Sequence, residues 1–215
     1  MQLQRSATLK EQAYEAILDS IAANKIEHGK IYSEKWFADS FQISRTPVRE
    51  ALLQFRQEGL FDVFPNRGVK LRVPTRQDAK NIFEMRAAIE GYCAGYLARH
   101  HTEEAAQRSL AKIRDSLERC WVDFSKEEEL FIHEETIRFC GNPLFQEQFD
   151  NMRTRIEIFW WNVIAAERRR SQVYEEHKAI LDCMVAGDEG GAWNASRRHS
   201  RITLELLYDM FPFEE

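Results

Sequence analysis

The segment Ser-Arg-Thr-Pro-Val-Arg at residues 44–49 decides how the first third of this 215-residue chain is interpreted. It combines a helix start signal, with Thr46 as the cap and Pro47 at the first helical position, with two arginines four residues apart. Arg45 and Arg49 at the exposed start of a helix suit phosphate and guanine contacts in a DNA major groove. Taken alone, the same six residues also describe a capped surface helix whose arginines are solvated.

The residues around this segment extend it into a helix-turn-helix. Residues 8–24 place apolar side chains at every fourth position and predict an amphipathic helix. Ser33 can cap a second short helix, which ends before a tight turn at residues 42–43. In the next helix, side chains at i, i+3, i+4 and i+7 form a buried stripe: Val48, Ala51, Leu52 and Phe55. Two short helices joined by a tight turn predict a helix-turn-helix, with residues 46–58 as the helix that reads DNA.

A β-hairpin is predicted directly after this helix. Residues 61–64 and 69–73 alternate apolar and polar side chains, and the Pro-Asn-Arg-Gly stretch at 65–68 has turn chemistry. A hairpin with a basic tip in this position is typical of the wing of a winged-helix domain. The alternative is an ordinary hairpin whose charges only keep the protein soluble. The order of helix, helix-turn-helix and basic hairpin is more specific than any one of its parts.

Charge is divided unevenly along the chain. The whole sequence has a net charge of −5, but residues 1–74 hold 11 Lys and Arg against 9 Asp and Glu, a net of +2. Residues 75–215 hold 19 against 26, a net of −7. This asymmetry confines a nucleic-acid contact to the N-terminal part, and so modest a positive charge predicts weak DNA binding by a single copy.

The rest of the chain predicts a helical domain. Near Val73-Pro74-Thr75 the proline stops the strand, and the threonine can cap the next helix. We therefore predict a mainly α protein, with a winged helix-turn-helix domain at residues 1–74 and an all-α bundle at residues 75–215. Periodicity and breaker residues place the helices of the bundle at roughly 76–100, 102–122, 126–140, 143–165, 170–186 and 188–210.

The segment at residues 150–165 is apolar on more than one face. Such a helix is usually central in a bundle or part of a subunit interface. We favour these two roles over a stacking role for Trp160 and Trp161.

Composition excludes several classes of protein. No run of about 18 apolar residues is present, so no membrane span is expected, and the N-terminus lacks the apolar core of a secretion signal. The four cysteines are widely scattered and form no C-x-x-C motif: Cys93, Cys120, Cys140 and Cys183. They are typical of reduced thiols in a cytoplasmic protein rather than of a disulfide framework or a zinc knuckle.

Four side chains of the helical domain have the chemistry of a metal site. Glu129 and His133 are four residues apart on one predicted helix and share a face, whereas His177 and His199 lie on two other helices. One carboxylate and three imidazoles could hold a divalent metal with positions left open for a ligand. The alternative is a solvated Glu–His pair and two unrelated histidines.

Residues 8–74 resemble the winged-helix domain of GntR-family bacterial transcription regulators. The matching stretches are residues 44–52, 58–60 and 65–68. The resemblance implies that Arg45 and Arg49 contact operator DNA with help from Thr46, and that Gly68 lets the wing approach the minor groove closely. Lys35 stands where the family usually has a DNA-contacting arginine. The full set of DNA-binding residues predicted in this way is Lys35, Ser44, Arg45, Thr46, Arg49, Asn66, Arg67 and Gly68.

Residues 76–210 resemble the FCD-type effector domain of the FadR branch of that family. The matching stretches are 83–90, 133–144, 176–180 and 197–199. Many members bind a metal through one aspartate and three histidines, which implies a metal site here. His133, His177 and His199 match the histidines, and Glu129 stands in place of the aspartate. Zinc is the metal we expect, with nickel and manganese as alternatives.

The same resemblance implies a small organic acid as the effector. Arg86 matches a family arginine and could pair with the carboxylate of that acid. The alternative for Arg86 is an internal salt bridge with Glu90, one helical turn away.

We therefore expect a cytoplasmic, homodimeric, metabolite-responsive repressor that binds double-stranded DNA with two half-sites. Two other classes compete with this hypothesis. One is a metal-dependent enzyme in the helical bundle, and the other is an architectural DNA-binding protein without an effector.

Overall fold

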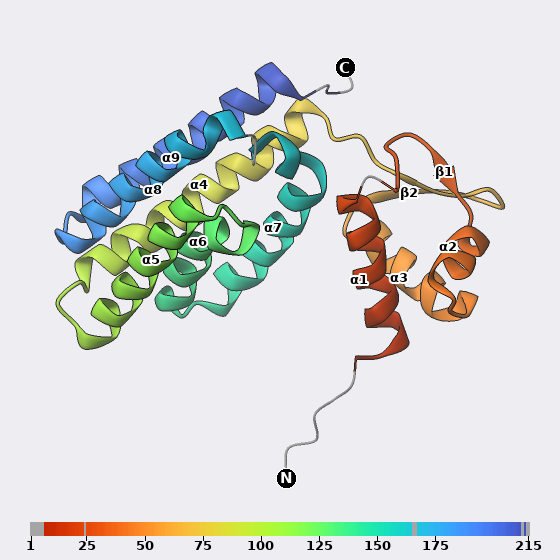
Figure 1. The fold of residues 1–215 in the computed structure, drawn as a ribbon, viewed down its shortest axis with the longest axis horizontal. Helices are drawn as coiled ribbons and strands as arrows, with labels where there is room; N and C mark the ends of the chain where they lie inside the picture. Colours follow the sequence, from red (N-terminus) through yellow and green to blue (C-terminus); the bar gives the residue numbers. More distant parts are fainter. Residues whose placement is uncertain (1–6, 24, 165–166, 212, 214–215) are drawn as a thin grey trace, which may run out of the picture. The chain divides into compact units, whose positions relative to one another are not determined.

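The computed structural model describes residues 7–23, 25–164, 167–211 and 213, apart from the side chains of residues 159–164 and 168. The chain forms two compact units, one ending at Pro74 and the other beginning at Thr75. Helices dominate both units, and the three described strands belong to the first unit (Figure 1). The mainly α fold class, with a small β-wing, is confirmed.

The first unit is a winged helix. Its elements follow the order α1 (Leu9–Ala22), β1 (Ile31–Tyr32), α2 (Glu34–Phe41), α3 (Arg45–Gln57), β2 (Phe61–Phe64) and β3 (Gly68–Leu71). The strands form one antiparallel sheet in the order β1-β3-β2. The predicted hairpin is therefore present. A third strand, β1, precedes α2 and places Tyr32 opposite Val69.

The start of α3 differs from the prediction. Ser44, not Thr46, occupies the N-cap, where its extended backbone makes no side-chain cap hydrogen bond. Thr46 is the second helical residue and Pro47 the third, so the predicted roles of both as cap and first residue are wrong. The proline is still tolerated because the first four N–H groups of a helix lack intrahelical partners.

An aromatic core fixes the reading helix in the first unit. Phe37 on α2 and Phe55 on α3 are fully buried, and Phe61 on β2 packs edge-on against both. Tyr14 on α1 stacks on Phe55 with a centroid distance of 4.2 Å. Burial of these rings contributes several kcal/mol, roughly 2 for each ring, so the core holds α3 rigidly beneath its exposed face.

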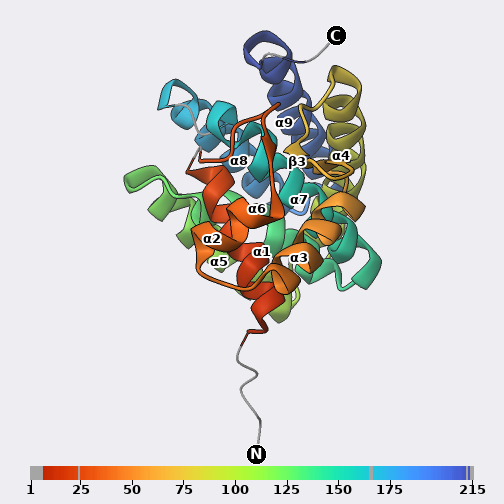
Figure 2. The ribbon, with the colours of Figure 1, turned by 90° about the vertical axis from the view of Figure 1, so that its right-hand side faces the viewer.

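The second unit is a helical bundle whose six α-helices lie within two residues of the predicted bounds. They are α4 (Arg76–Arg99), α5 (Glu104–Val122), α6 (Lys126–Cys140), α7 (Pro143–Ile164), α8 (Arg170–Val185) and α9 (Glu189–Met210), with a short 3-10 helix at Glu167–Arg169. Helices α4 and α9 run side by side (Figures 1 and 2). Gly95 permits this contact, because a Cβ there would lie 3.3 Å from the Glu189 carbonyl oxygen.

Helix α7 buries Phe149, Met152 and Ile156. The central or interface role of residues 150–165 stays a prediction. The side chains of Trp160 and Trp161 lie outside the part of the chain that the structure describes. None of the described helices is long and apolar enough to cross a membrane. All four cysteines are free thiols, in agreement with the prediction.

Candidate DNA-reading surface and histidine centre

The N-terminal end of α3 presents a polar surface to solvent. Ser44, Arg45, Thr46 and Arg49 are all exposed, whereas Val48 on the opposite side of the helix is fully buried. Lys35 is exposed on the first turn of α2. The side chains predicted to contact DNA from the helix-turn-helix are therefore accessible, on a helix whose other face is anchored in the core.

Arg49 forms an ion pair on the surface of the protein. Its Nε and Nη2 donate to both carboxylate oxygens of Glu34 on α2, at 2.8–3.1 Å. This hydrogen bonding from Arg49 lowers the pKa of Glu34 below its ordinary value. The pair is largely exposed, with 63% of the Arg49 side chain accessible. Exposed ion pairs contribute at most about 1 kcal/mol, so Arg49 can exchange Glu34 for a phosphate or a base at little cost.

The wing tip carries Asn66 and Arg67, which are exposed between β2 and β3. Asn66 adopts a left-handed conformation with φ 60°, which asparagine tolerates in tight turns. Gly68 has φ +129°, and a Cβ at this position would lie 2.1 Å from the Tyr32 carbonyl oxygen. The sheet itself therefore requires this glycine, independently of any contact with DNA.

Three predicted metal ligands converge in the second unit. His133 on α6, His177 on α8 and His199 on α9 each offer a ring nitrogen, and these nitrogens lie within 4.8 Å of one another. Their ring centroids are 4.7–5.2 Å apart, and all three side chains are buried. Buried imidazoles in such proximity fit a divalent metal, for which neutral ring nitrogens are the common ligands.

Two carboxylates lie beside these histidines. Oε2 of Glu176 on α8 is hydrogen-bonded to Nδ1 of His199 at 2.7 Å, whereas Oε2 of Glu90 on α4 lies 2.9 Å from Nδ1 of His133 without a hydrogen bond. A neutral imidazole that donates its Nδ1–H to a carboxylate directs the Nε2 lone pair inward. A carboxylate placed in this way fixes the orientation of a metal-binding histidine and raises its basicity as a ligand. Glu176 therefore orients His199 within a cluster that could hold a divalent metal.

Electrostatics keeps the histidines neutral. Burial lowers the pKa of all three well below the ordinary value, and the charge of Arg86 lowers each pKa further. A neutral ring retains the lone pair that a metal requires. The Nε2 atom of His177 is buried and has no hydrogen-bond partner within the described residues.

Arg86 on α4 enters the same cluster. Its Nε donates to Glu90 at 2.6 Å, which is the internal salt bridge that the spacing allowed. Its Nη2 also lies 2.8 Å from Nε2 of His133 and 3.4 Å from Nε2 of His199. The guanidinium thus occupies the lone pairs that a metal would need. A metal and Arg86 compete for these two nitrogens.

Glu129 is buried on α6, one turn before His133, but does not belong to the group of three histidines. Its side chain lies near enough to Cys120 to raise the pKa of that thiol, after the larger effect of burial. Its role as a metal ligand stays a prediction.

The orienting role of Glu176 was not predicted from the sequence. Its position carried a signal, since Glu176 directly precedes His177. Arg169 was missed altogether. It is buried, contacts Glu176 at 3.1 Å and donates to Thr203 at 3.0 Å, so it holds the carboxylate that orients His199.

The comparisons with known proteins match both units. Residues 9–71 match the gntR family of bacterial regulatory proteins, and residues 81–201 match the FCD domain. The chain belongs to the GntR family and carries an FCD domain. It is therefore a DNA-binding transcription regulator with an effector-binding domain, and neither the enzyme nor the architectural alternative is favoured.

Two curated relatives of this GntR regulator are repressors. The gluconate operon transcriptional repressor of Bacillus subtilis (strain 168) is 28% identical over 185 residues, covering 84% of this chain and 74% of the relative. The HTH-type transcriptional repressor RspR of Escherichia coli (strain K12) is 26% identical over 201 residues, covering 92% and 88%. The solved structure of E. coli McbR/YncC has the same fold, with a TM-score of 0.75 at 18% identity over 96% of this chain and 100% of that one.

Proposed function

We propose that this GntR regulator is a homodimeric repressor of the FadR branch, acting in the cytoplasm, and that a small organic acid controls its affinity for an operator with two half-sites. The observation that carries the proposal is the buried histidine centre of His133, His177 and His199, in which Glu176 orients His199. It lies in the FCD domain of a chain whose winged helix exposes Arg45 and Arg49.

The histidine centre would hold a divalent metal, with zinc the first candidate and nickel or manganese the alternatives. A bound ion would offer open positions to a donor atom of an organic acid. The name of the Bacillus gluconate repressor associates that relative with the operon of a sugar acid, which supports this chemical class. Glu129 would complete the ligand set if its side chain turned toward the histidines.

DNA recognition would begin with electrostatic contacts and end with base contacts. Arg45, Arg49 and Lys35 would bind phosphates and guanines from the helix-turn-helix, while Ser44 and Thr46 donate hydroxyl hydrogen bonds. Asn66, Arg67 and Gly68 would bring the wing to the neighbouring groove. The net charge of +2 in residues 1–74 limits the affinity of one copy, so two copies on one palindromic site would be required.

Effector and operator must oppose each other if the protein is a repressor released by its ligand. Ligand binding in the FCD domain would favour a dimer in which the two reading helices no longer match the half-site spacing. If the ligand lowers the affinity of the protein for operator DNA by some factor, bound operator DNA must lower its affinity for the ligand by the same factor.

A randomised double-stranded DNA library, selected on the purified protein and sequenced, tests this proposal. The expected result is an enriched motif with two-fold symmetry, and the same motif should disappear when Arg49→Ala protein is used. An Arg201→Ala variant is the matched control, because Arg201 is an exposed arginine of α9 in the other unit. Absence of any enriched motif, or an asymmetric motif unaffected by Arg49→Ala, would overturn the assignment.

A further inference from the structure

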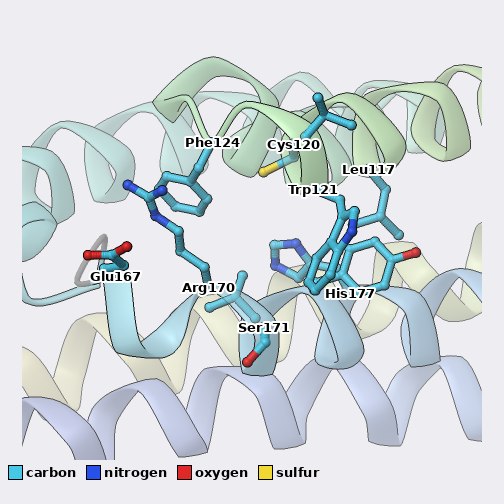
Figure 3. A pocket seen from close by; sticks show the side chains of 11 residues that line it. Leu117, Cys120, Trp121, Phe124, Glu167, Arg170, Ser171 and His177 are labelled. Atoms are coloured by element: carbon cyan, nitrogen blue, oxygen red, sulfur yellow. The ribbon is translucent and has the colours of Figure 1, made fainter.

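A cavity of about 260 Å³ opens in the second unit where α5, α8 and the 3-10 helix Glu167–Arg169 meet (Figure 3). Aromatic and apolar side chains form much of its wall, and His177 closes one part of it. The lining side chains used below are Leu117, Trp121, Phe124, Arg170, Tyr174 and His177. A cavity of this size has room for a small organic molecule.

Arg170 supplies a positive charge to this cavity. Its guanidinium lies 5.0 Å from the centroid of the Phe124 ring, a cation–π contact. Among the described residues, the structure gives Arg170 no ion pair, although the Glu167 carboxylate lines the same wall (Figure 3). An arginine that an aromatic ring holds in place, without a carboxylate partner, is prepared to bind an anion.

Apolar surface lies next to this charge. Trp121 is 58% exposed, a large fraction for a tryptophan, and its ring packs against Tyr174 at a centroid distance of 4.7 Å. Leu117 adds an aliphatic contact from the same face of α5 as Trp121. A flat apolar body between these side chains would be removed from water, which is the main source of affinity in small-molecule sites.

The polar boundary of the cavity is His177. The imidazole faces the space between Trp121 and Arg170 in Figure 3 and is only 1% exposed. Its buried Nε2 has no hydrogen-bond partner among the residues that the structure describes. A ligand in the cavity would therefore lie against the histidine centre, so the cavity connects solvent with that centre.

Arg86 is less suited to hold a carboxylate than Arg170. Its charge is already balanced by Glu90 at 2.6 Å, and its remaining donor is directed at His133 and His199. Removing the Arg86 guanidinium from these partners would leave the buried Glu90 charge uncompensated. Arg170 has neither constraint.

We infer that this cavity is the effector site, and that it binds a small monocarboxylate with a flat apolar body. Arg170 holds the carboxylate, Trp121 and Tyr174 contact the apolar body, and the inner end of the ligand lies against His177. The effector role of the site rests on the proposed function, whereas the binding chemistry does not.

Binding of benzoate, measured by isothermal titration calorimetry on the full chain after chelation of metals, tests the inference. Benzoate has nine heavy atoms, and benzamide is its uncharged isostere. We expect benzoate to bind at least tenfold more tightly than benzamide, and Arg170→Gln to remove that preference, because a charge-assisted pair is worth about a factor of ten or more. Trp121→Ala should weaken both compounds, and Arg201→Gln, on another face of the bundle, should change neither.

Several results would overturn the site. Equal binding of benzoate to wild type and Arg170→Gln would remove Arg170 as the carboxylate partner, as would equal binding of benzoate and benzamide. Failure of benzoate to bind the wild type would refute the chemical class. Repeating the titration with zinc-loaded protein shows whether the anion binds at the histidine centre instead of at Arg170. Binding that requires zinc but not Arg170 would contradict this inference. It would leave the proposed function intact. Conversely, Arg170-dependent binding that leaves the affinity for the selected DNA unchanged keeps the site and contradicts its effector role.

Discussion

Two arginine–glutamate pairs in this chain differ chiefly in their exposure to water. Arg49–Glu34, in the helix-turn-helix, has 63% and 34% of its side chains exposed, whereas Arg86–Glu90, in the histidine centre, has 4% and 3%. The first pair is screened and weak, so Arg49 can change partners at little cost. The second is buried within a hydrogen-bonded network, and neither partner can leave alone. The same two residue types thus form an exchangeable pair on the surface of one unit and a fixed pair in the interior of the other.

Removal of Glu90 should have the largest effect on stability. Glu90→Ala leaves the Arg86 charge buried without its carboxylate. We expect a loss of about 3–5 kcal/mol in the free energy of unfolding of the helical unit, measured by urea denaturation. Glu34→Ala is the matched control and should cost no more than about 1 kcal/mol. Similar losses in the two variants would show that burial does not separate the pairs.

Acid should destabilise the metal-free helical unit. The folded pKa of each cluster histidine is depressed, so the unfolded state binds more protons below its ordinary value of about 6.5. Stability is fully present above pH 6.5 and falls as the pH drops below it, by up to about 1.4 kcal/mol per pH unit for each histidine. Melting temperatures at pH 7.5, 6.5 and 5.5 measure this effect. A flat profile in the wild type would contradict neutral buried histidines.

Arg49→Ala should weaken binding to the selected operator by about 1–3 kcal/mol and relax its base preference, because Arg49 is assigned a base contact. Fluorescence anisotropy with labelled DNA at fixed salt measures the change. Arg56→Ala provides a control in the last turn of the same helix, where we expect a smaller loss with no change of base preference.

Removing the charge of Glu34, the partner of Arg49, should have the smallest effect on DNA binding. Glu34→Gln removes a carboxylate that competes with DNA for Arg49. We expect tighter binding by no more than about 1 kcal/mol, with a steeper dependence on salt, since one more cation becomes available to phosphates. Weaker binding of this variant would mean that Glu34 positions Arg49 for DNA instead of competing with it.

Much of the fold follows from local sequence signals. Apolar periodicity and helix caps such as Ser33 and Thr75 act within a few residues of the chain. The ends of the bundle helices can therefore be predicted to within two residues of those in the structure. The third strand, Ile31–Tyr32, is only two residues long, and its pairing with residues 69–70 is not a local property. The choice of Ser44 over Thr46 as N-cap was missed because both residue types are favoured there.

The sequence predicts which histidines form the candidate site, but not the contacts that they make within it. The three histidines were identified by family spacing and meet as expected. The interaction of Arg86 with His133 joins residues 47 positions apart and depends on the packing of α4 against α6, which no spacing rule provides. Arg170 gave no signal at all, because only the tertiary structure places it beside Phe124 in a cavity that reaches His177.

We propose that the histidine centre holds a metal in the regulator as it is purified. Native mass spectrometry with elemental analysis, on wild type and His177→Ala, tests it most directly. The account predicts a dimer with about one divalent metal per chain in the wild type and none in the variant. A wild-type protein that stays metal-free after addition of zinc, nickel and manganese would contradict it, and would leave Arg86 as the permanent occupant of the three-histidine cluster.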